Sequence, residues 1–201
     1  MVGKGHTHQP TMQNLIYDVG LFDGSDTAYY LSRGFNVVAV DANPTMIEAA
    51  KQRFSKEVSN GKLTLLNVGI ASARGSSTFC ISDHVEWSSF DVSIASRDGN
   101  SHKPITVTTT PFADILSEYG TPHYLKIDIE GYDRLCVEAL EGKTLPRFIS
   151  VESECAGDPL KLSDDDATSM LRLLRHVGYK RFKFVNQLDL VPANPTHRAI
   201  L

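Results

Sequence analysis

Short apolar runs alternate with amphipathic stretches over the first third of the chain. The predicted strands are three apolar runs, at residues 14–20, 36–41 and 63–67. Helical patterns fill the two gaps between them, with Ser25 as the expected N-cap and Gly34 as the stop of the first helix. Asn43 and Pro44 are expected to begin the second helix, which extends to about Val58. This order predicts parallel strands joined by crossover helices, as in a doubly wound α/β sheet.

The pattern changes in the middle of the chain and then returns. Residues 76–82 and 105–110 are rich in Ser, Thr and Ile and predict two β segments. The long polar stretch between them, residues 83–104, contains the only tryptophan, Trp87, and is expected to be a lid or a mobile loop. After residue 122 the alternation resumes, with strands expected at 123–129 and 147–152, helices at 132–140 and from Ser163 to Val177, and final strands at 181–185 and 196–201. We therefore expect one domain at 14–201 after a polar tail at 1–13.

Composition excludes several classes of protein. Hydrophobic residues make up 41% and charged residues 22% of the 201 residues, as in ordinary globular proteins. The net charge of −4 argues against a general nucleic-acid binder, and no apolar run is long enough to span a bilayer. Cys80, Cys136 and Cys155 are too widely spaced for a disulfide framework or a metal motif. We expect a cytoplasmic protein, monomeric or homodimeric, that binds neither nucleic acid nor membrane and acts on a small molecule.

A glycine-containing turn follows the first predicted strand, in Asp18-Val-Gly20-Leu-Phe-Asp-Gly24. Glycine lets the backbone turn sharply and approach a ligand closely. Gly20 and Gly24 are not spaced as in the Gly-x-Gly-x-x-Gly dinucleotide motif, so a pyrophosphate cradle is the weaker interpretation. Asp41 ends the next strand, where a carboxylate can accept both hydroxyls of a ribose. The alternative is a tight turn plus a helix-flanking aspartate, but the combination favours a nucleoside site.

A second polar motif lies in Lys126-Ile-Asp128-Ile-Glu130-Gly131. The two-residue period of a strand directs Lys126, Asp128 and Glu130 to one face, at the carboxyl end where open α/β sheets bind ligands. Two neighbouring carboxylates raise the pKa of one of them, which makes it a candidate base. The alternatives are that Lys126 only neutralises them, or that Glu130-Gly131 only begins a helix.

Glu152 ends the next strand and is expected to face the same crevice, although a solvated glutamate is a close alternative. His6 and His8 form only a weak candidate pair in a polar terminus, and the other histidines show no ligand spacing, so no metal site is predicted. The basic run between Arg172 and Lys183 is expected to be a solvated face.

Six short segments carry a family resemblance, at residues 18–24, 26–27, 30–34, 40–44, 126–131 and 150–152. In order and spacing they resemble the FkbM family of S-adenosylmethionine-dependent methyltransferases. The resemblance implies a Rossmann-like class I methyltransferase sheet of about seven strands with the last antiparallel. It also implies O-methylation of a hydroxyl on a sugar or other small metabolite, with S-adenosylhomocysteine as product.

The resemblance also assigns roles to residues. Asp18, Gly20 and Gly24 would line the methionine end of the cofactor, Asp41 would hold the ribose, and Asn67 would lie near the adenine. Phe22 stands where Asn or Gly is common in the family.

An alcohol acceptor needs a base as the methyl group arrives. Asp128 is the first choice and also a cofactor neighbour, Glu130 is the second choice, and Glu152 is expected to orient the substrate. Two alternatives stay open. One is an NAD(P)-dependent oxidoreductase, against which the missing second glycine of the Gly-x-Gly-x-x-Gly motif argues. The other is a non-catalytic nucleoside-binding module.

Overall fold

The structure is a computed structural model, and it describes residues 14–152, 166–183 and 185. These residues fall into two compact units, with residues 14–152 in the first and the remainder in the second. The side chains of residues 166–168 are also outside the description. The single domain at 14–201 and the tail at 1–13 stay predictions.

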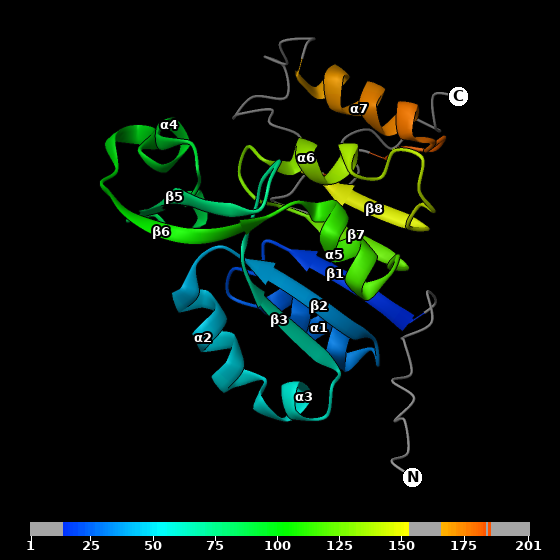
Figure 1. Cartoon of the computed structure of the whole chain (residues 1–201), viewed down its shortest axis with the longest axis horizontal. Coiled ribbons are helices and arrows are strands. Elements are labelled where there is room, and N and C mark those ends of the chain that lie inside the picture. Colours follow the sequence, from blue (N-terminus) through cyan, green and yellow to red (C-terminus); the bar gives the residue numbers. More distant parts are fainter. Residues whose placement is uncertain (1–13, 153–165, 184, 186–201) are drawn as a thin grey trace. The chain divides into compact units, whose positions relative to one another are not determined.

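A parallel sheet of five strands organises the first unit, in the order β3-β2-β1-β7-β8. The strands are β1 (Leu15–Val19), β2 (Asn36–Asp41), β3 (Leu63–Asn67), β7 (Tyr124–Ile127) and β8 (Phe148–Val151). The chain runs outward from β1 to β3 and then returns to the other side of β1 with β7 (Figure 1). The strand order therefore reverses between β1 and β7, and open α/β sheets bind ligands at such a point. All five strands were predicted from their apolar runs.

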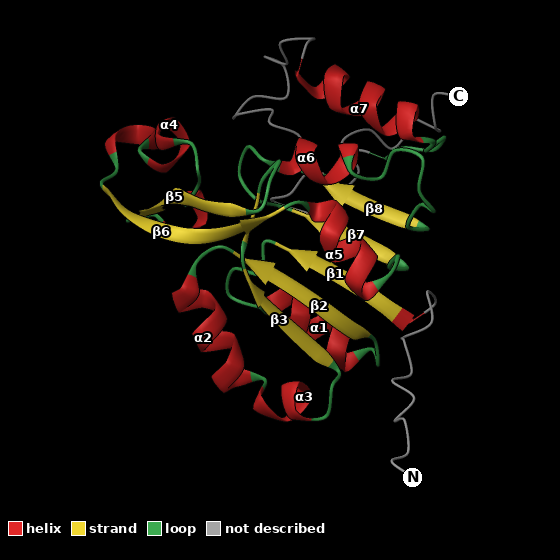
Figure 2. Ribbon diagram, in the orientation of Figure 1, coloured by secondary structure: helices red, strands yellow, loops and turns green. Residues whose placement is uncertain are grey.

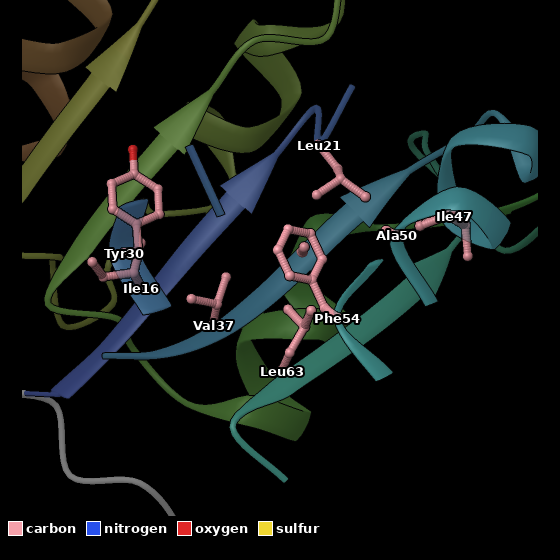
Figure 3. Packing of buried hydrophobic residues seen from close by; sticks show 9 residues of the cluster. Ile16, Leu21, Tyr30, Val37, Ile47, Ala50, Phe54 and Leu63 are labelled. Atoms are coloured by element: carbon pink, nitrogen blue, oxygen red, sulfur yellow. The ribbon is translucent and has the colours of Figure 1, made fainter. Parts of the chain in front are cut away.

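Helices cover both faces of this sheet (Figure 2). They are α1 (Ser25–Ser32), α2 (Pro44–Arg53), α3 (Ser55–Ser59), α5 (Phe112–Tyr119) and α6 (Asp133–Glu138). Ile16 packs toward α1 and α2 in a buried cluster (Figure 3), whose members are Ile16, Leu21, Tyr30, Val37, Ala39, Ile47, Ala50, Phe54 and Leu63. The next residue, Tyr17, lies edge to face with Phe112 of α5 at 6.1 Å between ring centroids. Its hydroxyl donates to the carbonyl oxygen of Gly120 at 2.6 Å. Ile16 and Tyr17, which are adjacent in β1, thus pack against helices on opposite faces of the sheet. This arrangement confirms the doubly wound α/β class.

The first two helices begin and end partly as predicted. Asn43 caps α2, because its side-chain oxygen accepts from the Thr45 amide at 3.0 Å. Ser25 as the N-cap of α1 is wrong, since Gly24 at φ 74° is the N-cap and the Ser25 amide donates to Asp23 instead. The predicted single helix to Val58 is also interrupted, at Phe54 (φ −110°, ψ 30°), whose ring is buried in the core.

A small mixed sheet follows β3 in the chain, in the order β4-β6-β5. It comprises β4 (Gly69–Ile70), β5 (Gly75–Ser82) and β6 (His102–Thr110), and the antiparallel β5–β6 pair confirms the two predicted β segments. The connection between them contains η2 (Val85–Trp87), α4 (Val92–Ala95) and η3 (Arg97–Gly99). The stretch predicted as a lid or a mobile loop, residues 83–104, therefore contains three short helical segments and the start of β6, and its role as a lid stays a prediction. The small sheet extends from the edge toward which the arrows of β1 and β2 point (Figure 1).

The second unit contains helix α7 (Asp166–Val177), which stops before Gly178 as expected. Ser163 and the predicted strand at 196–201 lie outside the described residues. Residues 181–183 form no strand, and Val185 forms a single bridge. Within the described part of the chain the central sheet has five strands, so the sixth and seventh strands stay predictions. No helix in that part is long and apolar enough to cross a membrane.

Candidate active site

The turn between β1 and α1 is pressed against the chain that leaves β7. Gly20 has φ 90°, and an added Cβ there would collide with the backbone carbonyl of Asp128. Only glycine fits this position, because both the left-handed backbone and the close approach exclude a side chain. Phe22 also has positive φ, at 49°, which is costly for an aromatic residue and explains why Asn or Gly suits this position. The turn therefore brings together the glycine-containing motif and the Lys126–Gly131 motif, which lie more than 100 residues apart in the sequence.

Asp41 connects this turn to the start of α2. One of its carboxylate oxygens accepts from the Phe22 amide at 2.9 Å and the other from the Asn43 amide at 2.8 Å. Burial raises the pKa of Asp41 to about 6, although these two amide hydrogen bonds act in the opposite direction. Asn67 supports the same corner, because its side-chain amide donates to the carbonyl oxygens of Asp41 (3.0 Å) and Ala42 (3.2 Å). Each carboxylate oxygen of Asp41 retains acceptor capacity, which fits a pair of ribose hydroxyls.

Asp18 and Lys126 form a buried ion pair beneath the turn. Asp18 is fully buried and accepts a hydrogen bond of 2.6 Å from the Thr27 hydroxyl. The ammonium of Lys126, on a side chain only 14% exposed, lies 3.2 Å from Asp18 and donates to the Gly20 carbonyl at 2.8 Å. It also lies 3.4 Å from Asp26 and 3.9 Å from Asp128. Burial lowers the pKa of Lys126, but the surrounding carboxylates outweigh it and raise the pKa, so Lys126 is the cation that joins the two motifs.

Three carboxylates gather at the carboxyl ends of β7 and β8. One side-chain oxygen from each of Asp128, Glu130 and Glu152 lies within 4.8 Å of the others, and all three residues are half-buried. The parallel register pairs Ile127 with Val151, so Asp128 and Glu152 follow adjacent strand ends. Burial raises the pKa of Glu152 to about 8, and the charges of Asp128, Glu130 and Asp133 add to the shift. Burial and the neighbouring charges therefore favour the protonated form of Glu152 at neutral pH.

Glu130 reaches this cluster through an unusual backbone. Its φ is 48° and that of Gly131 is 90°, so the extended strand stops and the chain turns sharply. A left-handed glutamate costs about 1–2 kcal/mol. The predicted two-residue alternation therefore ends before Glu130, yet its carboxylate still joins Asp128.

The spacing of the three carboxylates would also let a divalent cation bridge them. Acidic groups at this separation are common without an ion, and we assign no metal to them.

The family assignment follows from comparison with known proteins. Residues 18–181 match the family model for the methyltransferase FkbM domain. The chain belongs to the FkbM methyltransferase family. A solved structure, methyltransferase FkbM from Methylobacillus flagellatus KT, matches with 12% identity and a TM-score of 0.40, over 63% of this chain and 28% of that one. This chain thus spans under a third of that protein's length. No curated protein matches the chain.

The structure places the predicted site residues in two groups. Asp41 and Asn67 lie at one corner, with Gly20 and Gly24 shaping the adjacent turn. The second group is the acidic cluster, reached through the contact between Gly20 and Asp128. The carboxylate of Asp18 is buried under the turn and contacts Thr27 and Lys126, so its role at the methionine end of the cofactor stays a prediction.

Sequence reasoning undervalued two residues. Lys126 was weighed only against Asp128 and Glu130, whereas it contacts Asp18 and the Gly20 carbonyl more closely. The register pairing of Asp18 with Lys126 across β1 and β7 would have shown this. Ser89, whose hydroxyl bonds the Glu130 carbonyl, has no local sequence signal.

Proposed function

We propose that this FkbM methyltransferase transfers a methyl group from S-adenosylmethionine to a hydroxyl of a sugar or other small metabolite. The observation that carries the proposal is the meeting of two groups at one edge of the sheet. The Asp41 corner and the carboxylates of Asp128, Glu130 and Glu152 flank the point where the strand order reverses.

Asp41 is the group that would bind the cofactor ribose. Its two carboxylate oxygens are fixed by the Phe22 and Asn43 amides and retain acceptor capacity for two hydroxyls. Asn67 holds the backbone of the same corner, on the side where the adenine would lie. S-adenosylmethionine, when bound, supplies an electrophilic methyl group.

Asp128 is the group that would take the proton of the acceptor hydroxyl. A carboxylate within hydrogen-bond reach lets the oxygen attack without building a full positive charge. Glu130 is the second choice for the base. Glu152 keeps its proton at neutral pH, so it would donate a hydrogen bond that orients the acceptor.

Thermal-shift measurements with S-adenosylmethionine, S-adenosylhomocysteine, NAD and NADP test the donor. Stabilisation by the first two ligands alone supports the proposal, whereas stabilisation by NAD or NADP alone would replace it with the oxidoreductase. Formation of S-adenosylhomocysteine with a panel of sugars and small alcohols then tests turnover. Binding without turnover on any acceptor would indicate the non-catalytic nucleoside-binding module.

A further inference from the structure

Two adjacent residues of the β5–β6 connection reach the loop that carries Glu130. The hydroxyl of Ser89 donates to the backbone carbonyl of Glu130 at 2.8 Å, across 41 positions in the sequence. The ring of Phe90 lies against that of Tyr132, with 5.2 Å between centroids. These contacts hold the loop on both sides of Gly131.

Ser89 is itself held firmly by the small sheet. It is fully buried, and its backbone exchanges two hydrogen bonds with Cys80 of β5, at 2.9 and 3.1 Å. Its hydroxyl oxygen accepts from the Asp91 amide at 3.0 Å. A hydroxyl has a single proton to donate, and here that proton goes to Glu130.

Phe90 is fixed in a similar way. Its ring lies 5.1 Å from that of Phe79 on β5, at 69° between ring planes. It also fills the space beside Gly69, where an added Cβ would collide with the ring. Ser89 and Phe90 therefore contact both the small sheet and the loop after β7, so the position of the sheet fixes that of the loop.

The loop needs such support because its backbone is unfavourable. Glu130 and Gly131 have consecutive positive φ angles of 48° and 90°, and a glutamate in that region persists only where its surroundings impose it. This same conformation brings the Glu130 carboxylate within 4.8 Å of Asp128 and Glu152.

We propose that Ser89 and Phe90 are positioning residues that hold Glu130 in the acidic cluster. The effect on turnover rests on the proposed methyl transfer, while the positioning does not. The small sheet thereby forms part of the active site without contributing a reacting group.

The consequence is measurable at Glu152. The charged groups that face Glu152 are Asp128, Glu130 and Asp133, and Lys126 lies 3.9 Å from Asp128. Release of Glu130 from the cluster removes one like charge, so Glu152 should lose its proton at a lower pH.

The test is a pH titration of the Glu152 carboxyl by carbon NMR, assigned with Glu152→Gln. Ser89→Ala should lower the titration midpoint by about half a pH unit or more. Ser93→Ala is the matched control, because Ser93 is an exposed serine of the same connection whose hydroxyl bonds only Asp91 among the described contacts. Its midpoint should equal that of the wild type.

Phe90→Leu provides a second, independent variant that loses the ring contact with Tyr132, and its midpoint should also fall. An unchanged midpoint in folded Ser89→Ala, or in Phe90→Leu if Ser89→Ala does not fold, would overturn the proposal. Where turnover is measurable, Ser89→Ala should lower kcat about 10-fold to 100-fold with an unchanged KM for the methyl donor. The titration needs neither donor nor acceptor, so absence of methyl transfer would contradict the proposed function and leave the positioning result readable.

Discussion

The turn after β1 and the acidic cluster lie at the same edge of the sheet but treat their carboxylates in opposite ways. In and around the turn, Asp18, Asp23 and Asp41 each accept hydrogen bonds from donors nearby. In the cluster, Asp128, Glu130 and Glu152 face one another, and burial together with like charge keeps Glu152 protonated at neutral pH. The carboxylates around the turn are therefore held by hydrogen-bond donors, whereas like charges in the cluster help to raise the pKa of Glu152. Lys126 lies between the two and contacts both.

The largest effect is expected from Asp128→Asn. The substitution is nearly isosteric, so fold and most donor affinity should remain, while turnover falls about 10²–10⁴-fold because the base is lost. The measurement is the rate of S-adenosylhomocysteine formation with a working acceptor. Asp114→Asn, which removes a surface pair with Arg74, is the matched control and should keep its rate. Near-full turnover in Asp128→Asn would remove the proton-exchange role from this residue.

Lys126→Met should lower the free energy of unfolding by about 3–5 kcal/mol, because it leaves the buried Asp18 without its cation. Urea denaturation measures the loss. Lys51→Met, at an exposed pair with Glu48, should change stability by less than about 1 kcal/mol. The double variant Asp18→Asn/Lys126→Met should recover part of the loss. A loss below about 1 kcal/mol in Lys126→Met would show that the turn does not depend on this cation.

The parts of the fold that were predicted depend on local signals. Asn43 and Pro44 begin α2 because capping is decided within a few residues. Helix α5 was not predicted from the sequence, since Pro111 precedes it and contributes no side-chain cap. The break at Phe54 also has a nonlocal cause, because its ring fills the space beside Gly24 in the core.

The candidate site also contains some residues that local signals predicted and others that they did not. Asp41 and the acidic residues of the cluster were found because strand ends of a parallel sheet share one edge. The buried position of Asp18 and the contact from Ser89 were not found, because each depends on pairing between segments far apart in sequence.

The pH dependence of stability tests whether the acidic cluster raises the pKa of Glu152. Its pKa in the folded protein is about 8, above its ordinary value of 4.5. A carboxyl with a raised pKa binds its proton more tightly in the folded state, so this contribution to stability is present below pH 4.5 and is lost as pH rises through 8. Glu152→Gln lacks this loss and should gain stability relative to the wild type between pH 5 and pH 9. Urea midpoints across that range measure it, with Glu48→Gln as the exposed control. Parallel curves for Glu152→Gln and the wild type would contradict the raised pKa.

The smallest effect is expected in the turn, at Phe22. Its φ of 49° suits asparagine better, and its ring is 38% exposed, so little packing is lost on substitution. Phe22→Asn should raise the free energy of unfolding by up to about 1 kcal/mol. Tyr29→Asn, at a 61% exposed aromatic in helix α1, should lower it instead. A clear loss in Phe22→Asn would mean that the ring stabilises the turn.

The most direct test of the separate roles proposed for Asp41 (cofactor binding) and Asp128 (acceptor deprotonation) is calorimetry with S-adenosylhomocysteine. It compares the wild type, Asp41→Ala and Asp128→Asn. Asp41→Ala should weaken binding by about 1–3 kcal/mol, because it removes a charged hydrogen-bond acceptor. Asp128→Asn should bind within about threefold of the wild type, since its carboxylate is assigned to the acceptor side. Equal binding by Asp41→Ala and the wild type, together with weak binding by Asp128→Asn, would contradict the assignment and make Asp128 the cofactor ligand.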